Sequence, residues 1–336
     1  MRFFIRAKHI LWAVVALFSV LFILSLSPTY RPSEIEYGVT FSSKQSRNLG
    51  LDWRAVYLAM LDDLNIQKLR LPVYWDELEQ QRGQYNWNDL DWQIDQAEKR
   101  NIELILAVGQ RVPRWPECHL PNWVNDLSEQ NRQAATIEHI KQTISRYKNR
   151  PSVRIWEVEN EPFLPYFGMC PPFKKDFLDQ EIKEVRSLDT RPILITDSGE
   201  LSTWVMAAKR GDIFGTTMYR DTYSRALHSY IHYPITPTFF KVKKNLANLF
   251  AAPADWIVIE LQGEPWGREA FQTLTQAERD RTMNQKKFKE MVSFSQQSGF
   301  KTFYWWGVEF WYWEKQKGNS FYWDEAKKLF NPYGKS

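Results

Sequence analysis

The sequence has few of the residues on which several common enzyme sites depend. Its 336 residues include two cysteines, five histidines and 14 glycines. No Gly-x-Ser-x-Gly or phosphate-loop pattern occurs, which argues against serine esterases and nucleotide-dependent enzymes. His119 is the only histidine near either cysteine, so the spacing of a four-ligand zinc site is missing. We therefore expect neither a metal nor a cofactor.

The chain also lacks a large excess of charge of either sign. It has 44 Lys and Arg against 40 Asp and Glu, and three of the basic residues but no acidic ones fall in the first 27 positions. The remainder is almost neutral, so no nucleic acid partner is expected. Aromatic residues make up 15% of the chain and include 16 Trp. Flat apolar rings suit sugar binding, although a Trp-rich core gives the same composition.

The N-terminus carries the only long apolar run. Three basic residues within the first eight positions precede a run from Ile10 to Leu26 that two serines interrupt. This pattern predicts a signal-anchor or a signal peptide over residues 1–27, and its length alone does not separate the two. Because no Ala-x-Ala type of cleavage site follows, an uncleaved membrane anchor is favoured. The basic flank then places the rest of the chain in the periplasm or outside the cell, and cleavage would make it secreted.

After a polar tether, residues 28–36, apolar runs alternate with amphipathic stretches over 37–336. Predicted strands are Tyr37–Phe41, Lys68–Val73, Glu103–Val108, Val153–Val158, Pro192–Thr196, Ile213–Met218, Trp256–Glu260 and Thr302–Trp306. Predicted helices are Trp53–Leu64, Leu90–Arg100, Gln130–Tyr147, Phe177–Leu188 and Gln276–Ser298. This repetition predicts a single α/β domain, a monomeric (β/α)8 TIM barrel. A doubly wound sheet fits less well, because Thr40-Phe-Ser-Ser-Lys-Gln after the first strand carries no glycine.

Two loop features follow from this assignment. Cys118 and Cys170 lie in consecutive strand-to-helix loops, which can approach one another at one barrel mouth, so we predict a disulfide between them. The connection from Tyr219 to Phe240 is long and aromatic. We expect it to form a lid or a wall of a binding subsite.

Two of the predicted apolar strands end in an acidic residue. Arg154-Ile-Trp-Glu-Val-Glu-Asn-Glu-Pro ends at Glu161, and Trp256-Ile-Val-Ile ends at Glu260. Acids at the carboxyl ends of barrel strands lie at the mouth, where glycoside hydrolysis requires a pair of carboxyl groups. Glu157 and Glu159 share a face with Glu161 but lie deeper, so we expect them to pair with basic groups inside the barrel or to point out at a bulge.

The motif Asn160-Glu161-Pro162 after a Trp-containing strand resembles the cellulase-like clan of retaining glycoside hydrolases. The resemblance implies that Glu161 on strand four is the acid/base, that Asn160 binds the sugar 2-hydroxyl, and that Glu260 on strand seven is the nucleophile. Glu264, in Gly-Glu-Pro-Trp, is the alternative nucleophile. The family's usual Glu-aromatic-Gly is replaced by Glu260-Leu-Gln-Gly, which leaves the surroundings of the nucleophile open.

Similar enzymes orient the nucleophile with an Arg and a Tyr at the positions of Arg70 and Tyr219. An ionised nucleophile needs such cationic and hydrogen-bonding support. For Arg70 an ion pair with Glu157 or Glu159 is an equal alternative.

Several further residues are candidates for sugar contacts. Related barrels place a Trp from strand eight under the catalytic subsite, and Trp306 suits this place by alternation, with Trp305 in reserve. Neighbouring subsites could use Trp75, Trp115, Trp123 or Trp266, and for each of these core packing is an equal alternative. His119, Asp197 and Glu200 fall in loops after predicted strands three and five and could bind sugar hydroxyls or cap helices, and Glu309 after strand eight is a further candidate site residue.

These patterns predict a glycosidase that cleaves O-glycosidic bonds of an oligo- or polysaccharide with retention. A transglycosylase using the same residues is the nearest alternative, and a barrel that binds carbohydrate without catalysis is a second. The sequence does not specify the sugar, the linkage, or whether chain ends or interiors are cut.

Overall fold

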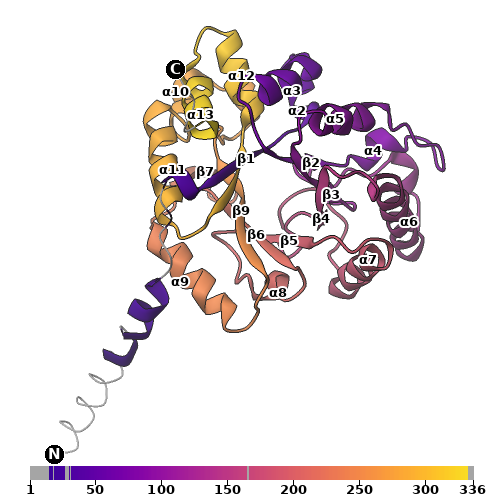
Figure 1. Cartoon of the computed structure of the whole chain (residues 1–336), viewed down its shortest axis with the longest axis horizontal. Coiled ribbons are helices and arrows are strands. Elements are labelled where there is room, and N and C mark those ends of the chain that lie inside the picture. The colour runs from indigo at the N-terminus through magenta and orange to yellow at the C-terminus, as the bar shows by residue number, and fades with distance from the viewer. Residues whose placement is uncertain (1–14, 18, 27–29, 31, 165, 332–336) are drawn as a thin grey trace, which may run out of the picture.

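The structure is a computed structural model that describes residues 15–17, 19–26, 30, 32–164 and 166–331. Part of the predicted N-terminal anchor, residues 1–14, 18 and 27, lies outside these residues. Within the described part of the chain, no helix has both the length and the apolar character needed to cross a membrane. Residues 19–25 are helical and leave the domain beside α9 (Figure 1).

Eight parallel strands close into a barrel, as predicted. They are β1 (Glu36–Thr40), β2 (Lys68–Pro72), β3 (Glu103–Val108), β4 (Val153–Val158), β5 (Ile193–Asp197), β6 (Ile213–Met218), β9 (Asp255–Gln262) and β10 (Thr302–Trp306). Their order is β1-β10-β9-β6-β5-β4-β3-β2, and β2 closes the barrel on β1. The predicted strand ranges match these within two residues at each end, although β1 takes the last residue of the predicted tether.

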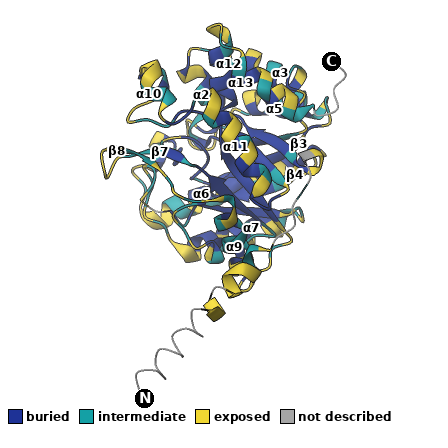
Figure 2. Cartoon of the chain, turned by 90° about the vertical axis from the view of Figure 1, so that its left-hand side faces the viewer, coloured by how far each residue is buried: buried dark blue, intermediate teal, exposed yellow. Residues whose placement is uncertain are grey.

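Helices surround the barrel (Figures 1 and 2). They are α2 (Ser43–Asn48), α3 (Trp53–Asp62), α4 (Trp75–Leu78), α5 (Asn88–Glu98), α6 (Glu129–Tyr147), α7 (Lys175–Leu188), α8 (Val205–Ala208), α9 (Pro237–Asn248), α10 (Gln276–Asp280), α11 (Gln285–Gln297), α12 (Val308–Gln316) and α13 (Phe321–Phe330). Short 3-10 turns cover Pro32–Glu34, Asn122–Val124 and Phe271–Thr273. Figure 2 shows the strands buried at the centre and the exposed residues on the outer helices.

The strands are apolar on both faces because each is covered on both sides. Val, Leu and aromatic side chains between strands and helices form the main core. A smaller cluster around Ile105, Leu194, Ile257 and Ile259 fills the barrel interior. Since this layer fills the interior, no ligand can pass through the barrel, and the carboxyl ends of the strands form its functional face in enzymes of this fold.

The predicted helices were incomplete, and α2, α12 and α13 were not among them. The predicted helix 276–298 is two helices, α10 and α11, and Asn284 begins the second by accepting a hydrogen bond from the Lys287 backbone N–H. The predicted capping box at Thr275 and Glu278 is present at the start of α10. The long connection after β6 is not irregular: it contains the hairpin β7 (Asp221–Ser224) and β8 (Ser229–His232), and then α9.

Candidate active site

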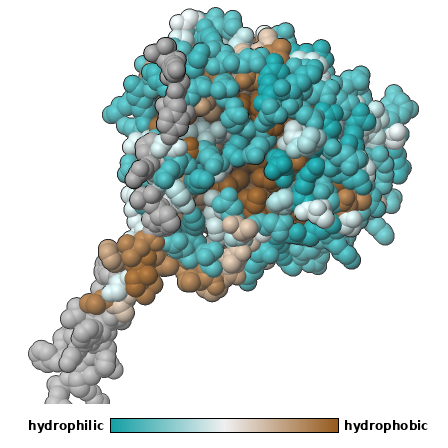
Figure 3. All heavy atoms as spheres, viewed as in Figure 1, coloured by the Kyte–Doolittle hydropathy of each residue, from teal (hydrophilic) through white to brown (hydrophobic). Residues whose placement is uncertain are grey.

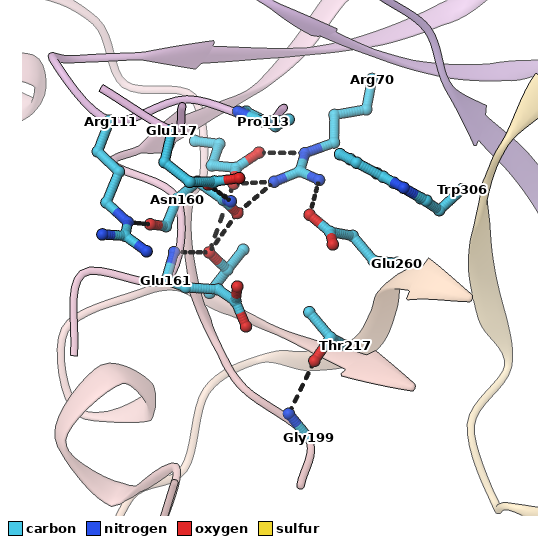
Figure 4. Close-up of polar contacts among 12 residues, drawn as sticks. Arg70, Arg111, Pro113, Glu117, Asn160, Glu161, Gly199, Thr217, Glu260 and Trp306 are labelled. Atoms are coloured by element: carbon cyan, nitrogen blue, oxygen red, sulfur yellow. Dashed lines mark hydrogen bonds and ion pairs between the residues drawn. The ribbon is translucent and has the colours of Figure 1, made fainter. Parts of the chain in front are cut away.

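The carboxyl ends of the strands bring the predicted acids together. Glu161 follows β4, and Glu260 lies near the end of β9. Figure 4 shows their carboxyl groups turned toward the same space, with Arg70 and Trp306 beside Glu260. Glu161 and Glu260 are 6% and 4% exposed, so both are nearly enclosed but still reach the mouth.

A β-bulge turns Glu260 into the barrel. Thr216 pairs with Val258 and Thr217 pairs with Glu260, so Ile259 is an extra residue in β9. Ile257 and Ile259 face the interior cluster, and regular alternation would therefore turn Glu260 outward. Bulges commonly re-aim a side chain beside an active site, and this one places Glu260 at the mouth.

Arg70 on β2 contacts both strands that carry the acids. Its Nε donates to Glu157 Oε2 at 2.6 Å, its Nη1 to Glu260 Oε1 at 2.8 Å, and its Nη2 to Asn160 Oδ1 at 2.8 Å. Arg70 and Glu157 are fully buried. The predicted ion pair with Glu157 is present, and the same guanidinium also contacts Glu260.

Tyr219 completes the support of Glu260. Its hydroxyl donates to Glu260 Oε2 at 3.0 Å, so each carboxylate oxygen of Glu260 accepts a hydrogen bond from a different residue. The Tyr219 backbone N–H donates to Glu200 Oε1 at 2.8 Å, which fixes the loop after β6. Glu260 thus has two side-chain donors, and one of them, Arg70, is a cation.

The carboxyl group of Glu161 lacks the hydrogen-bond donors that Glu260 has among the described residues. The backbone N–H of Glu161 donates to Thr196 Oγ1 at 2.7 Å, but within the described residues no group hydrogen-bonds its carboxyl oxygens. Burial raises its pKa well above the usual value, and the negative charges of Glu260 and Glu117 raise it further. The nearby Arg111 opposes these effects. Glu161 therefore favours the protonated form.

Glu159 does not join the pair. Its backbone has φ of 59°, which turns the side chain away from the barrel axis toward the loop after β3. There its oxygens accept hydrogen bonds from the backbone N–H groups of Gln110 and Arg111 at 2.8 and 2.9 Å. Glu157 faces inward and Glu159 outward, so each of the two predicted outcomes applies to one residue.

Glu264 belongs to a second ion cluster. Arg114 donates to Glu264 and also to Glu309 Oε2, and Trp306 Nε1 donates to Glu264 Oε1 at 2.8 Å. The Arg114 guanidinium lies over the Trp306 ring, 4.0 Å from its centroid. Glu264 is thus bound to a different arginine from Glu260. Glu309, the other candidate site residue, is fully buried in the same cluster.

The predicted tryptophans divide into mouth and core residues. Trp306 ends β10 at the mouth, and the half-buried Trp266 packs edge-on against Tyr219 with centroids 5.0 Å apart. Trp75 and Trp305 are fully buried. Both take the core-packing alternative, because Trp75 stacks on His139 and Trp305 stacks on Phe288 outside the barrel.

The other predicted tryptophans are on loops. Trp115 is 49% exposed, contacts Phe167 edge-on and has the Arg225 guanidinium over its ring, 4.7 Å from the centroid, so at most one ring face is available. Trp123 is half-buried, and its Nε1 donates to the Glu79 carbonyl at 2.9 Å.

His119 and Asp197 have structural partners that explain their burial. His119 Nε2 is 3.0 Å from the Arg114 carbonyl and its Nδ1 is 3.1 Å from Lys44 Nζ; burial and Lys44 lower its pKa to about 4. Asp197 Oδ1 accepts the Ser198 backbone N–H at 2.9 Å, and burial raises its pKa to about 6. The prediction that they contact sugar gains no support from these contacts.

Sequence reasoning missed one acid at the site. Glu117 follows β3, is 4% exposed, and accepts a hydrogen bond from Asn160 Nδ2 at 3.0 Å (Figure 4). Its neighbour Cys118 forms the predicted disulfide with Cys170, with Cα atoms 5.1 Å apart. The proximity of Glu117 to the cysteine was visible in the sequence, but no spacing pattern connected it with Asn160.

Unusual backbone conformations gather around the same residues. Arg114, Glu117, Glu159 and Glu161 all have positive φ although none is glycine. Such conformations persist where surrounding structure holds them, and they are common in active sites.

A family model described as Cellulase (glycosyl hydrolase family 5) matches residues 52–308. Among curated proteins, endo-1,4-beta-xylanase 3 of Hypocrea jecorina is 30% identical over 90 residues, which are 26% of this chain and 24% of that protein. A probable mannan endo-1,4-beta-mannosidase A-1 of Aspergillus terreus is 29% identical over 112 residues, 30% of this chain and 28% of that protein. The chain spans about a quarter of the length of these relatives.

Solved structures share the fold. A GH5_18 protein from Bifidobacterium longum subsp. longum has a TM-score of 0.57 at 15% identity, covering 81% of this chain and 69% of that one. An endo-beta-1,4-xylanase of glycoside hydrolase family 10 from Gloeophyllum trabeum has a TM-score of 0.53 at 16% identity, covering 81% and 84%.

Proposed function

Because the chain belongs to glycosyl hydrolase family 5, we propose that it hydrolyses O-glycosidic bonds of an oligo- or polysaccharide by a retaining double displacement. Glu161 is the acid/base and Glu260 is the nucleophile. The observation that carries this proposal is the contrast between the two carboxyl groups. Glu260 accepts hydrogen bonds from Arg70 and Tyr219, whereas Glu161 has no donor to its carboxyl among the described residues.

In the first step, Glu260 attacks the anomeric carbon while the carboxyl proton of Glu161 passes to the departing oxygen. The glycosidic bond breaks, and an ester forms between the sugar and Glu260. In the second step, ionised Glu161 takes a proton from water, whose oxygen attacks the same carbon and releases Glu260. A carboxyl group whose pKa is raised by burial, as that of Glu161 is, can hold the proton that the first step requires.

Asn160, Trp306 and Trp266 provide the proposed sugar contacts. Asn160 Oδ1 is held by Arg70 and one Nδ2 hydrogen by Glu117, so its second Nδ2 hydrogen is available to a sugar hydroxyl. Trp306 offers at most one ring face, because Arg114 covers the other. The names of the relatives make β-1,4-xylan and β-1,4-mannan the first polymers to test.

We also propose that the chain works outside the cytoplasm and is attached to a membrane through its N-terminal segment. The described residues 20–23 expose four apolar side chains, Val20, Leu21, Phe22 and Ile23. Figure 3 shows apolar atoms gathered where this segment meets the domain, and Asn245 of α9 donates to the carbonyls of Leu24 and Leu26. Detection of the full-length chain in the soluble rather than the membrane fraction would contradict attachment.

The function is tested with a panel of aryl glycosides and polysaccharides, followed by proton NMR of the first anomer released. Retention is expected, and inversion would contradict the mechanism. Glu161→Gln and Glu260→Gln are expected to lose nearly all activity while folded, whereas Glu269→Gln on an exposed loop should keep it. Reactions with an added acceptor sugar distinguish hydrolysis from transglycosylation, and sugar binding without turnover would favour a binding module.

A further inference from the structure

Glu117 is a third carboxyl group next to the two proposed catalytic acids. It lies in the loop after β3, and Figure 4 shows its carboxyl beside Asn160, on the side of Arg70. Its Oε2 accepts a hydrogen bond from Asn160 Nδ2 at 3.0 Å. A buried acid at a site that already contains two acids is costly, so its presence calls for a physical role.

The contact with Glu117 fixes which way the Asn160 amide points. Asn160 Oδ1 accepts a hydrogen bond from Arg70 Nη2 at 2.8 Å, while its Nδ2 faces Glu117. A flipped amide would set its oxygen against the carboxyl of Glu117 and its NH2 group against the Arg70 guanidinium. Arg70 and Glu117 therefore hold Asn160 in one orientation, with one Nδ2 hydrogen left for a ligand.

The charge of Glu117 also acts on Glu161. Burial raises the pKa of Glu117 to about 7, with a further increase from Glu260, while Arg111, Asn160 and Arg70 lower it. Glu117 then titrates near neutrality, and its ionised form disfavours a second negative charge on Glu161. The groups that face Glu161 electrostatically are Glu260, Glu117, Arg111 and Asp197, and of these only Arg111 favours ionisation.

The loop holds Glu117 rigidly. Its φ is 72°, its backbone N–H donates to the Arg114 carbonyl at 2.7 Å, and its carbonyl accepts the Val112 N–H at 2.9 Å. The disulfide of the next residue, Cys118, ties the loop to Cys170 after β4. A carboxyl held by its backbone in this way can fix the geometry of its neighbours.

We propose that Glu117 is a positioning residue that orients Asn160 toward the sugar and, through its negative charge, keeps the proton on Glu161. This inference rests on the proposed function. It assigns two separable effects to one side chain, because the hydrogen bond depends on where the oxygen lies and the electrostatic effect depends on charge.

Two substitutions separate these effects. Glu117→Gln keeps an acceptor oxygen but removes the charge, so the alkaline limb of the kcat/KM profile should move to lower pH by about 1 unit. Glu117→Asp keeps the charge but shortens the side chain, so the limb should stay near that of the wild type. The preference of the Glu117→Asp variant for a substrate over its 2-deoxy analogue should fall about tenfold, because the hydrogen bond between Asn160 and residue 117 is loosened.

Glu314 on α12 provides the matched control. It is 5% exposed, close to the 4% of Glu117, and it too accepts a hydrogen bond from an asparagine, Asn319 Nδ2, at 2.6 Å. Glu314→Gln should leave both the pH profile and the 2-deoxy preference unchanged.

The outcomes are distinguishable from failure of the proposed function. If the wild-type chain hydrolyses no glycoside, the proposed function fails. If the wild-type chain is active and the pH profile of kcat/KM for Glu117→Gln superimposes on that of the wild type, the electrostatic role is overturned. An unchanged 2-deoxy preference in Glu117→Asp overturns the orienting role, and this variant remains decisive should Glu117→Gln not fold.

Discussion

Glutamates that lie close together in the sequence have different partners here because their surroundings differ. Glu157, Glu159 and Glu161 alternate along one segment, yet only Glu161 reaches the mouth with a carboxyl free of donors among the described residues. The sequence predicted Glu161 and the partners of Glu260 from a motif and from strand positions. It could not predict the positive φ of Glu159 or the bulge before Glu260, because both depend on contacts with other strands.

The hydroxyl of Tyr219 is expected to contribute to catalysis through Glu260. Tyr219→Phe removes a hydrogen bond to a charged group, worth about 1.5–3 kcal/mol, so kcat/KM should fall roughly 10- to 100-fold. Steady-state kinetics with an aryl glycoside measures this. Tyr223→Phe on the half-buried hairpin strand β7 is the control, and equal activities of the two variants would contradict the role.

Arg70 is expected to matter for stability as well as for activity. Arg70→Met leaves buried Glu157 and Glu260 without their cation, so the free energy of unfolding should fall by about 3–5 kcal/mol. Urea denaturation followed by fluorescence measures the change. Arg54→Met breaks the exposed pair with Asp89 and should cost less than about 1 kcal/mol; similar losses in both variants would argue against a buried network.

Elements marked by long apolar runs were predicted well. Elements whose ends depend on local side-chain interactions were not. The barrel strands are continuous buried runs, so the sequence predicted them closely. α9 was missed because its aromatic residues read as part of a loop, although Pro237 occupies the first turn. The break between α10 and α11 depends on the Asn284 side chain accepting a backbone hydrogen bond, which periodicity does not reveal.

The packing of α6 on α4 makes stability depend on pH. His139 on α6 stacks on Trp75 of α4, and burial lowers its pKa to about 3. The unfolded chain binds this proton below about pH 6.5, whereas the folded chain stays unprotonated until about pH 3. Stability should therefore decrease as the pH falls through this window, by about 1.4 kcal/mol per unit.

His139→Leu should remove this contribution. Its free energy of unfolding, measured in urea between pH 6.5 and 4, should fall less steeply with decreasing pH than that of the wild type. His228→Leu at an exposed position of the hairpin loop should retain the wild-type slope. A His139→Leu slope equal to that of the wild type would contradict a buried neutral histidine.

At the scale of the whole molecule, barrel closure assembles the site from segments far apart in the chain. Arg70, Glu161, Tyr219 and Glu260 come from four barrel strands or the residues that follow them, and all meet at the carboxyl ends. The architecture was predictable because strand ends of a TIM barrel converge there. The position of Glu117 was not predictable, since nothing in the sequence pattern of its loop shows that its side chain would turn toward Asn160.

The most direct test of the central claim is to trap the covalent intermediate. A 2-deoxy-2-fluoro glycoside with a good leaving group, matched to the preferred sugar, should slow the second step more than the first and leave the sugar attached. Peptide mass spectrometry is expected to find it on Glu260. Attachment to Glu264, or release of the inverted anomer with no labelled peptide, would contradict the assignment of the nucleophile.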